Sequence, residues 1–218
     1  MAVTHFLSCV VRFNDHFTGA AVPDELPVRL DGSFQRPAAS SGGSRRRQSD
    51  GTYRFVGAPG GPARILWRDP FTRDHLGWTR WDEDPEIVLP LAEPAAMLAF
   101  DLWPTADATA PSGATGVRGR LVGPDAAGQE VRIAMQGEPF DRFTRSDEHG
   151  NFLFLPPGRL ALDASGRVAL TIAVSTPGGG PRIVNGGNFL PGGAGPDFGA
   201  ADFSIAPRSV PRILFRLA

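Results

Sequence analysis

The stretch Ser146-Asp147-Glu148-His149-Gly150-Asn151-Phe152-Leu153-Phe154 places a polar turn that ends in Gly before a run of apolar residues. A shorter version, Ser49-Asp50-Gly51-Thr52-Tyr53-Arg54-Phe55, occurs in the first half of the chain. A Pro-Gly pair follows each copy, at Pro157-Gly158 and at Pro59-Gly60. Turns of this kind between apolar runs are typical of β-hairpins. The repetition predicts two copies of one β-rich unit.

Each part of this motif has a folding role. Asp or Asn hydrogen-bonds to its own backbone in a turn, and Gly adopts the positive φ that the turn needs. The two aromatic residues lie on one face of the strand, where they can fill the core between two sheets. The motif therefore contains no catalytic group.

Composition favours the same fold class. The 218 residues include 27 Gly and 21 Pro, which are spread between short apolar runs. The chain is long enough for two small domains, each with its own core. We therefore expect an all-β protein.

Apolar alternation predicts the same order of strands in both halves of the chain. In the first half the expected strands are residues 6–13, 27–30, 52–56, 63–67, 86–91 and 95–103. The last of these reads as a strand in preference to a short helix. In the second half they are residues 116–122, 130–135, 151–155, 168–174, 201–205 and 213–217. In each half the third and fourth strands are expected to form a hairpin, and Phe189, Phe198 and Phe203 are expected to pin long loops.

The predicted domains are residues 1–103 and 116–218, joined by a linker over residues 104–115. The linker is built from Ala, Thr, Ser, Pro and Gly with one Asp, Asp107. Such a composition is typical of a connecting segment.

The second half resembles a known family. The residues that carry the resemblance are Val117-Arg118-Gly119-Arg120-Leu121-Val122, Gly128 to Ile133, the Asp147 to Phe152 turn, Leu155-Pro156-Pro157-Gly158 and Val168 to Ile172. Together they look like the carboxypeptidase regulatory-like domain. The likeness covers residues 116–175 well and residues 1–91 more loosely. It implies two tandem transthyretin-like (prealbumin-like) β-sandwich domains that serve as accessory, adhesive or scaffolding modules.

Enzymes with similar sandwiches do not fit this sequence. An intradiol dioxygenase needs two Tyr and two His around iron, whereas this chain has a single tyrosine, Tyr53. A hydroxyisourate hydrolase ends in Tyr-Arg-Gly-Ser, whereas this chain ends in Phe215-Arg216-Leu217-Ala218. The absence of Lys excludes lysine-dependent catalysis and Lys–Asn isopeptide bonds. We therefore expect no enzyme activity and no cofactor.

Neither a disulfide nor a metal site is expected. Cys9 is the single cysteine and lies in an alternating apolar run, which predicts a buried strand residue. The four histidines lack ligand spacing; they are His5, His16, His75 and His149. The acidic run from Asp82 to Glu86 contains no Gly-based calcium loop, so it is read as a solvated turn.

Two segments are candidates for contact with a partner. Trp78, Arg80 and Trp81 stand among polar and charged residues, and they are the preferred patch. Together with Trp67 and Trp103, these tryptophans form either a buried packing cluster or an exposed carbohydrate platform. Arg45, Arg46 and Arg47 lie in a Gly-Ser-rich loop, which is either a basic finger for phosphate or an acidic partner, or a solvated loop.

The sequence thus predicts a non-catalytic structural or adaptor protein that binds protein partners, in a homo-oligomer or a larger assembly. A net charge of −1 gives no long-range attraction to nucleic acid or membrane. The N-terminus lacks a secretory pattern, so synthesis in the cytoplasm is expected, with release only as part of a particle or by a non-classical route. A bacterial phage-tail-like or contractile injection particle is the hypothesised context. A carbohydrate-binding module that uses the tryptophans is the alternative.

Overall fold

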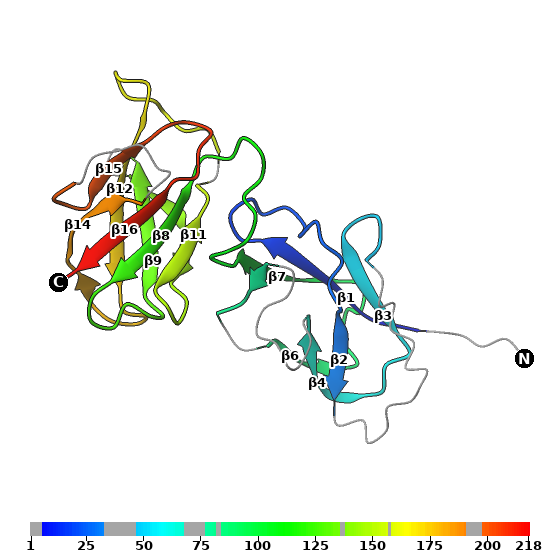
Figure 1. Cartoon of the computed structure of the whole chain (residues 1–218). Helices are drawn as coiled ribbons and strands as arrows, with labels where there is room; N and C mark the ends of the chain where they lie inside the picture. The colour runs from blue at the N-terminus through cyan, green and yellow to red at the C-terminus, as the bar shows by residue number, and fades with distance from the viewer. Residues whose placement is uncertain are drawn as a thin grey trace, which may run out of the picture. The chain divides into compact units, whose positions relative to one another are not determined.

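The computed structural model describes residues 6–32, 47–67, 77–81, 84–135, 138–156, 158–190 and 198–218. The chain divides into two compact units, Met1–Trp103 and Pro104–Ala218 (Figure 1). The predicted linker, residues 104–115, belongs to the second of these units. Every regular element in the described residues is a β-strand. None of these residues forms a helix that could cross a membrane.

The first unit contains two sheets. Its strands are β1 (Leu7–Asp15), β2 (Arg29–Gly32), β3 (Thr52–Val56), β4 (Gly61–Leu66), β5 (Trp78–Thr79), β6 (Glu86–Leu89) and β7 (Met97–Pro104). One sheet has the order β3-β1-β7-β5 and the other the order β2-β4-β6. The prediction of a strand rather than a helix is confirmed, because β7 pairs with β1 in parallel.

The core of the first unit lies between these sheets. Phe13 from β1 contacts the rings of Tyr53 and Trp67, with centroid distances of 6.3 and 6.4 Å. The hydroxyl oxygen of Tyr53 accepts a buried hydrogen bond of 2.8 Å from the backbone N–H of Leu26. Cys9 is fully buried in the same cluster, as predicted.

The second unit repeats this plan. Its strands are β8 (Val117–Val122), β9 (Glu130–Met135), β10 (Glu138–Arg145), β11 (Asn151–Phe154), β12 (Val168–Ser175), β13 (Pro181–Arg182), β14 (Val184–Phe189), β15 (Asp202–Ile205) and β16 (Arg212–Leu217). One sheet has the order β11-β8-β16-β14. The other has the order β10-β9-β12-β13, and β15 also pairs with β12.

The two units share the same strand pairing. β1 lies between antiparallel β3 and parallel β7, and β8 lies between antiparallel β11 and parallel β16. In the opposite sheets, β4 pairs with β2 and β6, as β12 pairs with β9 and β15. The prediction of an all-β chain with two tandem β-sandwich units is confirmed.

The two predicted hairpins are wrong. β3 and β4 belong to different sheets, and so do β11 and β12. The reason is that both strands of each pair supply buried residues to one core, which they reach from opposite sides. In each unit the chain therefore crosses from one layer of the sandwich to the other between these two strands, and does not return to a neighbouring strand.

The predicted aromatic loops form a packed cluster instead. Phe189 lies in β14 and Phe203 in β15. Phe198 stacks on Phe203 at a centroid distance of 5.7 Å and contacts Phe215 at 5.8 Å. β5, β10, β13 and β14 were not predicted, whereas the extra strand at residues 201–205 is confirmed as β15.

The two turns that introduce β3 and β11 have the expected geometry. Gly51 and Gly150 have φ values of 79° and 80°. The Oδ1 atom of Asp50 accepts the backbone N–H of Thr52 at 2.9 Å, and the Oδ1 atom of Asp147 accepts the backbone N–H of Asn151 at 2.8 Å. The Asp and Gly of each motif are therefore used by the turn itself.

The hydrogen-bonded carboxylate of Asp50 should make the stability of the first unit depend on acid pH. Hydrogen bonds from the hydroxyl and the backbone N–H of Thr52 lower the pKa of Asp50 from 3.8 to about 2. Since the folded pKa lies below the unfolded one, this group stabilises the fold above pH ~4, and the contribution disappears as the pH falls towards ~2. We expect Asp50→Asn to flatten the pH dependence of the urea midpoint in this range.

Tryptophan fluorescence can follow this transition, because all four tryptophans lie within residues 67–103. Glu93→Gln, which removes the same charge at an exposed position, is the matched control. An acid dependence that is as steep in Asp50→Asn as in the unmodified protein would refute the assignment.

Candidate functional site

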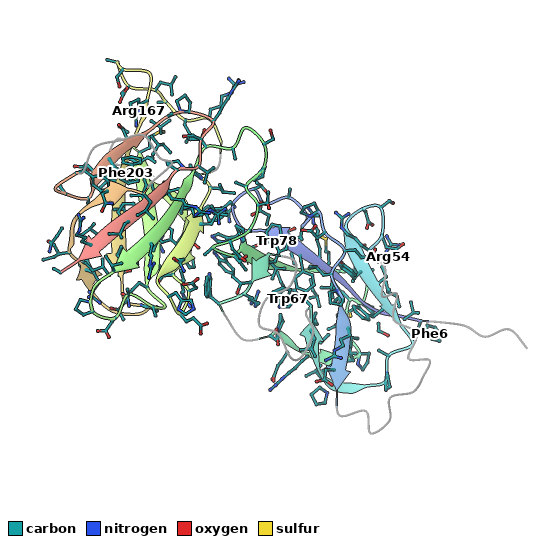
Figure 2. All side chains as sticks on the ribbon, viewed as in Figure 1. Phe6, Arg54, Trp67, Trp78, Arg167 and Phe203 are labelled. Atoms are coloured by element: carbon teal, nitrogen blue, oxygen red, sulfur yellow. The ribbon has the colours of Figure 1, made fainter. Side chains whose placement is uncertain are left out.

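Trp78, which was predicted to be part of a partner-contact patch, is mostly buried. It is only 9% exposed and belongs to the core of the first unit (Figure 2). Its indole Nε1 donates a hydrogen bond of 2.7 Å to Oδ2 of Asp24. The indole is held by a residue distant in sequence, and this burial argues against a contact role for Trp78.

Arg80 and Trp81 are both half-buried. Arg80 donates from Nη1 to the carbonyl oxygen of Asp101 at 3.2 Å, and its guanidinium lies 5.7 Å from the ring centroid of Phe100. The guanidinium of Arg80 thus already makes a hydrogen bond and a cation–π contact within the first unit. A contact role for Arg80 and Trp81 stays a prediction.

The predicted basic finger lies mostly outside the described residues. Arg45 and Arg46 are not described, whereas Arg47 is half-buried beside Gly51, in the turn that precedes β3. Asp82 and Glu83 of the acidic turn are not described either.

The tryptophans do not form an exposed platform. Trp67 is fully buried, and Trp103 is 4% exposed. Trp103 stacks on the imidazole of His16 at a centroid distance of 4.4 Å, and Nδ1 of His16 lies 3.0 Å from Oδ2 of Asp101. With Trp78 also buried, three of the four indoles cannot offer a flat face to a sugar.

The described residues offer little to a nucleophilic or metal-dependent reaction. Burial raises the pKa of the Cys9 thiol to about 11, so the thiol is protonated at neutral pH. No group of three or more His, Cys, Asp or Glu side chains in the described ranges is arranged to hold a metal ion.

A different surface stands out in the second unit, on the solvent side of sheet β11-β8-β16-β14. Alternate residues of β8 and β16 point into the core, and the residues between them point to solvent. The solvent-side residues of these strands include four arginines, which we call the arginine face: Arg118, Arg120, Arg212 and Arg216.

The register places like charges together on the arginine face. Arg212 lies directly opposite Arg118 in the parallel pair of β16 and β8, and Arg120 lies opposite Leu214. Strands β8, β11, β14 and β16 contain no Asp or Glu. No salt bridge to Arg120 or Arg212 is found in the described part of the chain, and both side chains are exposed.

Two of the four arginines have neutral partners. Arg118 donates from Nη1 to the carbonyl oxygen of Ala106 and from Nη2 to that of Ala108, the latter at 2.6 Å. Desolvation and the nearby charge of Arg212 lower the pKa of Arg118. Arg216 donates from Nη2 to Oδ1 of Asn188 at 2.8 Å. These contacts orient two guanidinium groups, and the nearby negative charge of Asp107 partly offsets the charge of Arg118.

Sequence reasoning missed this surface, although its signal was visible. Val117-Arg118-Gly119-Arg120 and Arg212-Ile213-Leu214-Phe215-Arg216 both alternate arginine with core residues. Only the pairing of β8 with β16 brings the two sets together.

Comparisons with known proteins do not assign a family. No protein-family model matches the chain, and no curated protein matches it. The resemblance to the carboxypeptidase regulatory-like domain is therefore not confirmed.

Some solved structures are similar in part. The TIE protein of Bacillus anthracis has 10% identity and a TM-score of 0.33, over 97% of this chain and 34% of that protein. A streptococcal ancillary pilin has 10% identity and a TM-score of 0.32, over 98% and 62%. A DUF3823 family protein from Bacteroides ovatus has 8% identity and a TM-score of 0.27, over 91% and 98%. The chain thus spans less than two thirds of the length of the first two.

Proposed function

We propose that the chain is a non-catalytic structural or adaptor module that binds a protein partner through the arginine face of its second unit. The observation that carries this proposal is the cross-strand pair of Arg118 and Arg212. Like charges directly opposite one another weaken a sheet. A bound partner with negative charge relieves this repulsion, and so gives the pair a function.

The composition of the surface supports a protein partner. Arginine is enriched in protein interfaces, because its planar guanidinium forms several directed hydrogen bonds. Leu214 and Val122 lie between the arginines and are half-exposed, so the surface also has apolar contact area. The known catalytic sites of related folds, in contrast, have no counterpart in the sequence.

The narrower hypothesis is that the module belongs to a phage-tail-like or contractile injection particle. It rests on the occurrence of similar sandwiches in such particles, which is an analogy of fold. Electron microscopy and size-exclusion chromatography of the tagged chain, purified from its native host, test the hypothesis. A chain that is always recovered as a lone monomer would contradict it.

A charge-reversal experiment tests the proposed surface. We expect Arg120→Glu combined with Arg212→Glu to abolish association of the chain with its assembly in host extracts. The matched control is Arg29→Glu combined with Arg159→Glu, which makes the same charge change at exposed positions elsewhere. Circular dichroism verifies that both variants are folded. Equal association of the two variants would show that the arginine face is not the binding surface.

A further inference from the structure

We infer that the arginine face binds an acidic protein segment that presents carboxylates and apolar side chains, rather than a phosphate polymer. This inference rests on the proposed function and names the chemistry of the partner. It follows from the spacing of the arginines, from what separates them and from what the surface lacks.

The spacing of the arginines matches that of side chains on an extended chain. Arg118 and Arg120 are two residues apart on β8, so their Cα atoms are about 7 Å apart along the strand. Carboxylates at alternate positions of an extended partner have the same repeat of about 7 Å. Each carboxylate can accept two parallel hydrogen bonds from one guanidinium group.

The residues between the arginines favour a mixed partner. Leu214 lies opposite Arg120, and Val122 lies opposite Arg216. In these two pairs a cationic position lies opposite an apolar one, whereas Arg118 lies opposite Arg212. An acidic segment that also carries apolar side chains can fill both kinds of position, whereas a phosphate backbone leaves the apolar ones uncovered.

Features that serve single-stranded nucleic acid are missing from this surface. Such proteins stack bases on exposed aromatic rings. The solvent-side positions of β8 and β16 hold only Arg, Val and Leu, while Phe215 points into the core.

Fluorescence anisotropy with three labelled probes tests the inference on the full chain. The probes are a peptide of alternating Glu and Val, a mixed-sequence DNA duplex and inorganic polyphosphate. We expect the peptide to bind at low ionic strength and to be released by salt, since exposed charges are screened. Arg120→Glu with Arg212→Glu should weaken peptide binding at least about tenfold, because hydrogen bonds to charged groups contribute about 1.5–3 kcal/mol each.

The control variant, Arg29→Glu with Arg159→Glu, should bind the peptide as the unmodified chain does. If DNA or polyphosphate binds at least as tightly as the peptide, and the same charge reversal releases it, the carboxylate assignment is overturned while the arginine face stands. If the face variant and the control variant do not differ for any probe, the inference and the proposed surface both fail.

Discussion

Phe215→Ala is expected to lower the free energy of unfolding of the second unit by about 3–5 kcal/mol, the usual loss for a buried Phe. Phe215 is fully buried in β16. Its ring lies 5.4 Å from that of Phe203, 5.8 Å from that of Phe198 and 6.0 Å from that of Phe152. Removal of the ring therefore leaves a cavity where both sheets and the segment before β15 meet, and these rings cannot all move in to fill it.

The tryptophan content allows the two units to be followed separately. All four tryptophans lie within residues 67–103, so tryptophan fluorescence reports on the first unit, whereas far-ultraviolet circular dichroism reports on both. In urea titrations we expect Phe215→Ala to shift the dichroism transition and to leave the fluorescence transition in place. Leu162→Ala, at a residue that is 52% exposed, is the control and should change stability by less than about 0.5 kcal/mol. Equal losses in the two variants would contradict the assignment of Phe215 to the core.

The strands and their inward faces could be predicted because their signals are local. Alternation in the Asn151-Phe152-Leu153-Phe154 run places both aromatic rings on one face, and both are buried. The turn before this run is also encoded locally, since the Asp147 carboxylate binds the backbone of Asn151 within the same loop. Such features require no knowledge of the rest of the chain.

The connection between β3 and β4 could not be predicted in the same way. A Gly-rich turn is compatible with a hairpin and also with a crossing from one sheet to the other. The choice depends on whether β3 pairs with β4 or with β1. β3 pairs with β1, because Val11 and Phe13 continue the buried face of Tyr53. This competition between distant strands is not visible in the turn.

The candidate site could not be predicted for the same reason, because it also depends on contacts between residues that are distant in sequence. Polar neighbours favoured Trp78 as part of a contact patch, but Asp24, far away in sequence, accepts a hydrogen bond from its indole and the ring is buried. The arginine face was missed for the matching reason, since Arg118 and Arg212 meet only through the parallel pairing of the first and last long strands of the unit. Burial and charge clustering at these positions are properties of the tertiary fold.

Gly150→Ala is expected to destabilise the second unit by about 2–5 kcal/mol, the sum of a left-handed backbone and a steric clash. Gly150 has a φ of 80°. A Cβ atom at this position would lie 2.4 Å from the carbonyl oxygen of Leu121. The backbone N–H of Leu121 also donates to the carbonyl oxygen of Gly150 at 2.8 Å, so neither strand can withdraw without loss of that hydrogen bond.

Gly158→Ala separates the two causes. Gly158 has a φ of 81°, and a Cβ atom there would meet no atom within 4 Å. It should therefore show only the backbone cost, about 1–2 kcal/mol. Urea unfolding followed by far-ultraviolet circular dichroism measures both variants. If Gly150→Ala loses more stability than Gly158→Ala, then Gly150 is required both by the positive φ of the turn and by the close approach of β8. Equal losses of stability would mean that only the turn requires Gly150, and that β8 can move enough to accommodate a methyl group.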